Sequence, residues 1–178
     1  MGGFKRGGPG VRLSLERVEK AVLANLIGQL QQLFGELPKG DPGLAELGIS
    51  ESTKAPDDPV LARLFPDGYR DDGEASGEFR RYTEASLREG KERDAEIALK
   101  TLAGAEGAEA RLDAEQAQAW LRVLNDLRLA LGTRLELTED DHDRFRDLGE
   151  DDPEYTMIVT YDWLPQLQDG LVHCLWGD

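Results

Sequence analysis

The chain has 178 residues, of which 39% are hydrophobic and 32% charged, so it is long enough to form one domain with a sizeable core. Its net charge of −15 repels nucleic-acid phosphates and disfavours anionic membrane surfaces, and it suits a protein that meets a basic partner. A single cysteine, Cys174, excludes an intramolecular disulfide. The chain shows neither a signal peptide nor a run of about 20 apolar residues, which predicts a cytoplasmic protein without a membrane span.

The first residues predict a β-hairpin. Val11, Leu13 and Leu15 alternate with polar residues after a glycine-rich turn, which is the period of a strand. The turn lacks the Gly-x-x-x-x-Gly-Lys-Ser/Thr spacing of a phosphate-binding loop. Residues 110–112 are expected to add a short strand to this hairpin.

A long amphipathic helix is predicted from about residue 15 to 37, with Ser14 as its N-cap. Residues 38–57 are rich in proline, glycine and aspartate, and they predict a mobile loop. Asp58, followed by a proline, has the pattern of an N-cap and first helical position, so a short helix should begin there.

A third helix is predicted from about residue 76 to 102. Its middle, REGKERDAE (residues 88–96), has few apolar residues and is expected to project into solvent or to fray. The side chains expected on its buried face are Phe79, Tyr82 with Thr83, Leu87 and Ile97, with Leu99 and Leu102 near its end.

Asp113 is expected to cap a fourth long helix over residues 114–135. The acidic residues 136–152 predict a second mobile loop, and Asp152 is then expected to cap a last helix that runs from residue 153 to about 175. The prediction is a mainly α fold in a single domain, 1–178: a helical bundle of about four main helices with a small N-terminal β-hairpin.

The acidic block at residues 136–154 raises the question of a metal site. An EF-hand loop starting at Asp141 would place Phe145 and Arg146 where an oxygen ligand and a glycine are required. A solvated acidic loop is therefore favoured over a loose cation site. The two histidines, His142 and His173, lie in different elements. No metal, cofactor or catalytic residue is predicted.

A polar group beside a leucine-rich seam forms the candidate site. Asn125 and Arg128 are three residues apart and hence neighbours on one helical face, with Asp126 beside them. A guanidinium near a core needs a carboxylate or several carbonyls, because an unpaired buried charge is costly. The carboxylates considered as partners are Asp162, Asp71 and Asp72. The group is interpreted as a structural brace, with a partner-binding anchor and a catalytic role as alternatives.

Cys174 lies on an apolar helical face near the C-terminus. A buried and slowly reacting thiol is expected there, because reactive cysteines need exposure and nearby positive charge.

Three stretches carry a resemblance: DDPVLARLFPDGYRDD with EFRRYTE close behind, AWLRVLNDLRLALGTRLEL, and YDWLPQLQDGLV. They resemble an actinobacterial family catalogued as a domain of unknown function, whose members are often encoded beside the ClpS protease adaptor. Part of that family is described as oxidative-stress transcriptional regulators that act through an alternative sigma factor and a redox cysteine pair. The resemblance implies a shared fold over nearly the whole chain, but the sole cysteine here departs from the redox pair.

Two functions from different classes are compatible with these features. The first is a non-enzymatic regulatory protein that acts by protein–protein interaction, with a sigma factor or another basic protein as partner and no direct nucleic-acid binding; a homodimer is compatible with it. The alternative is a metal-dependent or hydrolase-like enzyme that uses the acidic loop and the Asn125/Arg128 face. A pocket of convergent carboxylates would favour the enzyme, and an exposed apolar patch would favour the binder. A stable helical protein without either role is the third interpretation.

Overall fold

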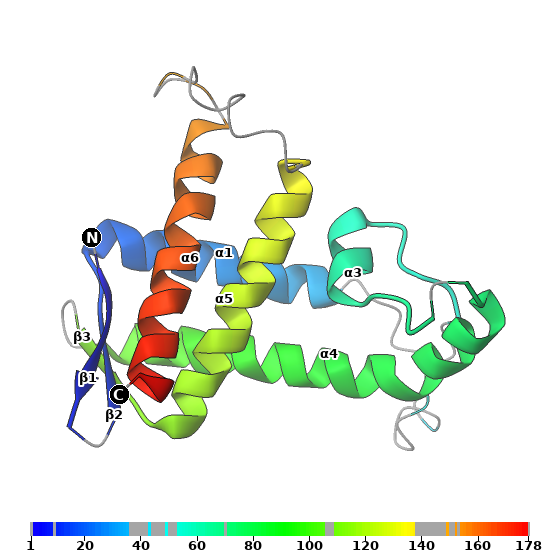
Figure 1. The fold of residues 1–178 in the computed structure, drawn as a ribbon, viewed down its shortest axis with the longest axis horizontal. Coiled ribbons are helices and arrows are strands. Elements are labelled where there is room, and N and C mark those ends of the chain that lie inside the picture. The colour runs from blue at the N-terminus through cyan, green and yellow to red at the C-terminus, as the bar shows by residue number, and fades with distance from the viewer. Residues whose placement is uncertain are drawn as a thin grey trace.

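The computed structural model describes residues 2–8, 10–35, 43, 49, 53–69, 71–105, 109–137, 149, 152 and 154–177. These residues form five helices and one three-stranded antiparallel sheet (Figure 1), which confirms the predicted mainly α fold with a small N-terminal β element. The loops predicted to be mobile, 38–57 and 136–152, lie largely outside the described residues. Within the described residues, no helix has both the length and the apolar character to cross a bilayer.

The sheet combines the N-terminal hairpin with a strand from the middle of the chain. Strands β1 (Gly3–Gly7) and β2 (Gly10–Ser14) pair antiparallel, and β3 (Glu109–Leu112) pairs with the other edge of β2. The hairpin turn contains Gly8 with φ of 70°, a left-handed conformation that glycine adopts without steric cost. The strand predicted at residues 110–112 is thereby confirmed.

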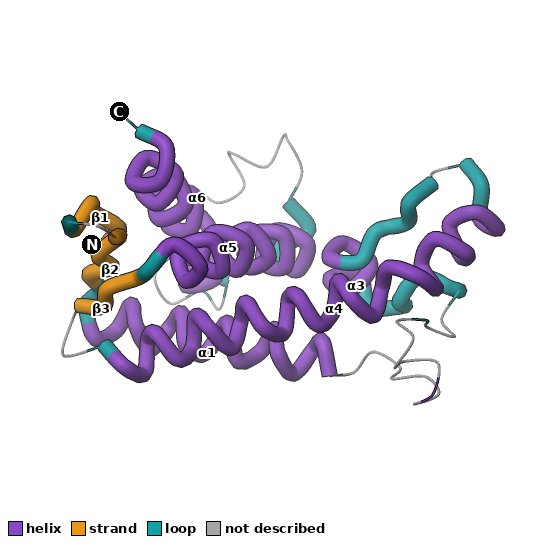
Figure 2. Tube along the Cα trace, turned by 90° about the horizontal axis from the view of Figure 1, so that it is seen from below, coloured by secondary structure: helices purple, strands orange, loops and turns teal. Residues whose placement is uncertain are grey.

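The helices form two layers. The helices are α1 (Arg17–Gly35), α3 (Pro59–Leu64), α4 (Gly73–Gly104), α5 (Ala114–Arg134) and α6 (Tyr155–Trp176). Helices α1 and α4 run along the long axis of the molecule, and α5 and α6 lie across them (Figures 1 and 2). Helix α6 also packs against β1, which joins the sheet to the helical layers.

Two predicted helix starts are confirmed by their capping hydrogen bonds. The Asp58 carboxylate accepts from the backbone N–H groups of Val60 and Leu61 at 2.8 and 3.0 Å. Asp113 forms a reciprocal capping box with Gln116, in which each side chain accepts from the other residue's backbone N–H. Both signals lie within four residues of sequence, so a local pattern was sufficient to predict them.

Two other helices begin two residues later than predicted. Ser14 is not an N-cap, because it is the last residue of β2 and pairs with Gly3. Helix α1 begins at Arg17 instead, and the Glu19 carboxylate accepts from the Glu16 N–H at 2.7 Å. Helix α6 begins at Tyr155 rather than residue 153, although the Asp152 carboxylate accepts from the Glu154 N–H at 2.8 Å.

Helix α4 differs most from its prediction. It is continuous through residues 88–96, where Asp94 and Ala95 are buried, so the predicted fraying is wrong. The predicted buried face is also wrong at Phe79, Tyr82 and Leu87, whose exposed fractions are 45%, 56% and 42%. The face that α4 buries carries polar side chains that are paired across the fold, and a search for apolar periodicity overlooks such a face.

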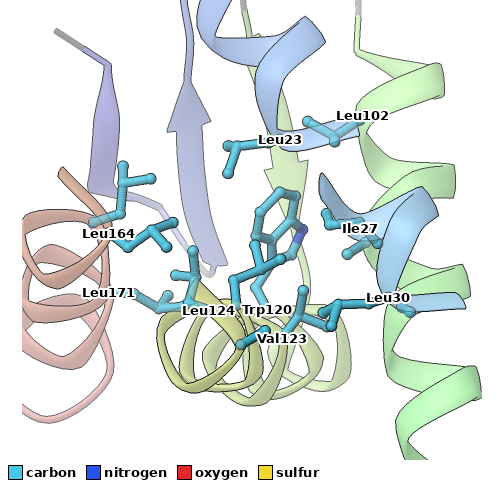
Figure 3. Close-up of a cluster of buried hydrophobic side chains, with 14 of the residues drawn as sticks. Leu23, Ile27, Leu30, Leu102, Trp120, Val123, Leu124, Leu164 and Leu171 are labelled. Atoms are coloured by element: carbon cyan, nitrogen blue, oxygen red, sulfur yellow. The ribbon is translucent and has the colours of Figure 1, made fainter. Parts of the chain in front are cut away.

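The core is centred on Trp120 of α5, which is 0% exposed (Figure 3). Its indole N–H donates to Thr101 Oγ1 at 2.7 Å, and its ring meets Phe4 edge to face at a centroid distance of 5.9 Å. Around it lie apolar side chains from α1, α4, α5 and α6: Leu23, Ile27, Leu30, Leu102, Val123, Leu124, Leu164 and Leu171. One side chain thus connects the sheet with both helical layers.

Candidate functional site

Arg128 and Gly132, four residues apart on α5, both face α6. Arg128 is half-buried, and its Nη1 donates to the Gln168 side-chain oxygen at 2.6 Å. One turn further along, Gly132 leaves room for the Tyr161 ring, because an added Cβ would lie 3.3 Å from Cε2 of that ring. The interpretation of Arg128 as a structural brace is compatible with this geometry.

The expected carboxylate partner of Arg128 is wrong. Within the described residues its partner is the neutral amide of Gln168, and no carboxylate lies within 4 Å of it. Asp162 is exposed on α6, and since it is six residues from Gln168 it points to another side of that helix. The Arg128 Nε is buried without a hydrogen-bond partner in the described structure.

Asp126 points away from Arg128, toward α4. It is 5% exposed, and Lys91 Nζ donates to its Oδ1 at 2.7 Å. One turn earlier on α5, Arg122 makes two hydrogen bonds of 2.6 and 2.7 Å to the Asp94 carboxylate. The predicted group is therefore divided between two interfaces, while Asn125 is exposed.

A cavity of about 560 Å³ lies at the junction of α4, α5 and α6. Its lining includes Asn125, Asp126 and Gln168, so the fold brings two of the predicted residues together with the partner of Arg128. The lining charges Lys91, Asp94, Arg122 and Asp126 are paired with one another. The charges of these four side chains therefore compensate one another in pairs, Lys91 with Asp126 and Arg122 with Asp94. Among the described residues, no three histidine, cysteine or acidic side chains are placed to hold a metal ion.

Burial raises the pKa of the Asp126 carboxyl, and the charge of Lys91 lowers it by less. The folded state therefore holds this proton to higher pH than the unfolded state. Its stabilising contribution is complete below the unfolded-state pKa of about 4 and is lost as pH rises through the folded-state pKa. We expect the difference in unfolding free energy, wild type minus Asp126→Asn, to fall as pH rises above about 4. Urea titrations at several pH values measure it, with the exposed Asp169→Asn as control; an increase with pH would contradict the assignment.

A second buried charge network lies at the other end of α4, and sequence reasoning missed it. Arg80 is 4% exposed and donates to Glu84 at 2.6 Å, to Asp67 at 2.7 Å and to the Phe65 carbonyl at 3.0 Å. Glu84 is itself 5% exposed. The only signal in the sequence is the four-residue spacing of Arg80 and Glu84, a spacing that is also common on exposed helix faces.

Beside this network is an aromatic surface, which we define as Tyr69, Phe79 and Tyr82. Their exposed fractions are 53%, 45% and 56%. The rings of Tyr69 and Phe79 meet edge to face at a centroid distance of 6.2 Å. Gly68 permits this contact, because an added Cβ would lie 2.6 Å from the Phe79 ring. Phe79 and Tyr82 were predicted to be buried, and no prediction was made for Tyr69.

Cys174 is half-buried on α6. Burial raises the pKa of its thiol, and the positive charge of Arg6 partly offsets this rise. The Arg6 Nε also donates to the Cys174 carbonyl at 3.3 Å, so a basic side chain from β1 lies closer than the sequence indicated.

The acidic residues 138–148 and His142, to which the cation-site alternative refers, lie outside the described residues.

Because the thiol pKa is raised, little thiolate is present at neutral pH and peroxide should react slowly with Cys174. We expect no covalent dimer on non-reducing gels after mild peroxide treatment. We also expect partner affinity to be the same for wild type and Cys174→Ser. A peroxide-driven dimer that Cys174→Ser abolishes would contradict this.

Comparison with known proteins gives a consistent result over nearly the whole chain. The family described as "Domain of unknown function (DUF2017)" matches residues 1–175. The "Oxidative stress regulator AosR" of Mycobacterium tuberculosis (strain ATCC 25618 / H37Rv) is 34% identical, covering 97% of this chain and 85% of the relative. The "Putative oxidative stress regulator AosR" of Mycobacterium leprae (strain TN) is 32% identical, covering 94% and 83%. No solved structure matches significantly.

Proposed function

This chain belongs to the DUF2017 family, and on that premise we propose that it is a non-enzymatic regulatory protein of the oxidative stress response that acts by binding a basic protein. The observation that carries the proposal is the 34% identity, over 97% of the chain, to a protein named as an oxidative stress regulator. Similarity over so much of the chain supports a similar role for the whole fold.

The charge of the chain supports a protein rather than DNA as the immediate partner. A net charge of −15 repels nucleic acid, because binding to phosphates relies on a lysine and arginine footprint. The same charge attracts a basic protein and accelerates its association. A sigma factor or another basic component of the transcription machinery is the partner class that joins a regulatory role with this charge.

The cavity at α4, α5 and α6 supports the enzyme alternative less well than the sequence similarity supports a regulatory protein. Its buried carboxylates, Asp94 and Asp126, each have a cationic partner at 2.6–2.7 Å. General acid–base or nucleophilic chemistry would need a group within reach of a substrate and not committed to a structural pair. Arg128, the predicted cation of this face, is bound to Gln168 instead.

The proposal is tested by capture from an extract of the native host. The immobilised chain should retain a basic protein, and the purified partner should bind with an affinity that falls as salt concentration rises. An unrelated acidic helical protein serves as the control for nonspecific retention. Loss of the gene should also change transcript levels after peroxide treatment. The absence of any saturable protein partner would contradict the proposal.

Direct DNA binding is expected to be absent. The isolated protein should not shift DNA fragments in a gel at physiological salt, because its net charge is −15. A shift that persists at physiological salt with nanomolar protein would contradict this and would favour a regulator that contacts DNA itself.

A further inference from the structure

Among the described residues, the aromatic surface lies at one end of the molecule. The N-terminal part of α4, together with α3, extends beyond α5, α6 and the sheet along the long axis (Figures 1 and 2). Phe79 and Tyr82 are three residues apart on α4 and therefore neighbours on its surface. Tyr69 adds a third ring from the loop between α3 and α4. Three half-exposed rings gathered in one place are more than the scattered exposed apolar residues of an ordinary surface.

The loop that carries Tyr69 is fixed in place by hydrogen bonds to two buried side chains of α4, Ser76 and Arg80. Ser76 Oγ accepts from the Tyr69 N–H at 3.0 Å and donates to the Tyr69 carbonyl at 2.6 Å. The buried Arg80 donates to the carbonyl of Phe65 and to the side chain of Asp67 in the same loop. A fixed array of rings loses little conformational entropy on binding, as is typical of binding hot spots.

The surroundings of this surface are acidic. Residues 65–84 contain six carboxylates and three arginines. One of these arginines, Arg80, is buried and paired with Glu84 and Asp67. Glu78 lies one turn from Tyr82 on α4, and Glu74 one turn before it. The exposed carboxylates, which we call the acidic rim, are Asp67, Asp71, Asp72, Glu74 and Glu78.

We propose that the aromatic surface and its acidic rim form the docking site for a basic segment of a protein partner. Apolar side chains of that segment pack on Phe79 and Tyr82, and its lysines or arginines pair with the rim or lie over the tyrosine rings. This assignment rests on the proposed function. It adds which surface of this chain binds the partner and which chemistry the partner's segment has. An anionic membrane or a second copy of the chain, which carries the same charge of −15, would be repelled by the rim.

The first test maps a defined probe on the full-length chain by NMR. The probe is a synthetic amphipathic peptide whose helix carries leucines on one face and lysines on the other. We expect amide shift changes concentrated at residues 67–87, and none with a control peptide in which glutamates replace the lysines. Changes concentrated instead on the groove between α1 and α4, where Glu89, Glu92 and Glu96 lie with Arg93 and Lys100, would overturn the assignment.

The second test uses matched variants at exposed positions, where folding is not at risk. Phe79→Ser and Tyr82→Ser should each weaken peptide affinity about tenfold or more. Val18→Ser and Trp176→Ser are the controls, since these apolar side chains are 72% and 61% exposed on α1 and α6. Equal weakening by the surface variants and the controls would overturn the proposal.

The contribution of the acidic rim is tested by charge removal. The double variant Glu74→Gln/Glu78→Gln should slow association and reduce its dependence on salt. The double variant Asp162→Asn/Asp169→Asn removes the same charge from exposed positions on α6 and should have a much smaller effect. A similar effect of both pairs would show that only the net charge matters and would overturn a localised site.

The natural partner separates a failure of this inference from a failure of the proposed function. If a partner binds the wild-type chain and Tyr82→Ser equally well, the regulatory function stands and the docking site is wrong. If no protein partner binds saturably, the proposed function fails. The NMR map still decides whether the aromatic surface binds the basic peptide. Self-association that Tyr82→Ser abolishes would assign the surface to a second copy and overturn the proposal.

Discussion

Replacement of Trp120 by alanine is expected to lower the free energy of unfolding by about 3–5 kcal/mol. The side chain is 0% exposed and lies where α1, α4, α5, α6 and the sheet meet, so no element can close the cavity without moving against another (Figure 3). The Thr101 hydroxyl would also lose the hydrogen bond that it accepts from the indole N–H. Guanidinium denaturation followed by far-UV circular dichroism measures the change.

Two control variants divide this effect into its parts. Trp120→Phe keeps an aromatic ring near Phe4 but loses the hydrogen bond to Thr101, so its cost should be smaller. Trp176→Ala removes an indole that is 61% exposed and should change stability by less than about 0.5 kcal/mol. A cost for Trp120→Ala as small as that of Trp176→Ala would show that the core is not organised around Trp120.

The parts of the fold that could be predicted from the sequence are those determined by nearby residues. The hairpin follows from alternation around a glycine-rich turn, and the start of α5 from Asp113 with Gln116 three residues later. The strand predicted at residues 110–112 lies within β3, which pairs with β2 of the hairpin. Ser14 shows the limit of this approach, since its capping potential was overridden by strand pairing with Gly3.

The orientation of α4 could not be predicted from apolar periodicity. Such an analysis selects Phe79 and Tyr82 as core residues, because it assigns the most hydrophobic side chains to the interior. The helix instead buries Arg80, Glu84 and Asp94. Arg80 and Glu84 pair with each other within α4, and Asp67 and Arg122 from other elements pair with Arg80 and Asp94. Asp67 and Arg122 are 13 and 28 residues away from Arg80 and Asp94, so these two pairings are visible only in the fold.

The candidate site was predicted as one group but lies in two interfaces. Asp126 and Arg128 are two residues apart and therefore point to different sides of α5, which the sequence already implied. The partners themselves, Lys91 on α4 and Gln168 on α6, depend on how the helices cross. A carboxylate was expected for Arg128 because it would neutralise the guanidinium charge. The amide oxygen of Gln168 instead accepts from one guanidinium N–H without burying a second charge.

Replacement of Arg80 by alanine is expected to lower the free energy of unfolding by about 3–5 kcal/mol, because it leaves the buried Glu84 carboxylate without its cation. The loop of Phe65 and Asp67 would also lose its bonds to α4. Urea denaturation measures the cost. A change below about 1 kcal/mol would show that the pair is effectively solvated.

The double variant Arg80→Met/Glu84→Leu separates the stability of the fold from the positioning of the aromatic surface. Two apolar side chains of similar volume remove both buried charges, so unfolding free energy should return to near or above the wild-type value. The hydrogen bonds to the Phe65 carbonyl and Asp67 stay absent, so the loop carrying Tyr69 loses one of its two attachments to α4, while Ser76 still holds the other. We therefore expect a stable protein that binds the basic peptide more weakly than wild type. Wild-type affinity in this variant would show that Arg80 supports the fold alone and not the docking site.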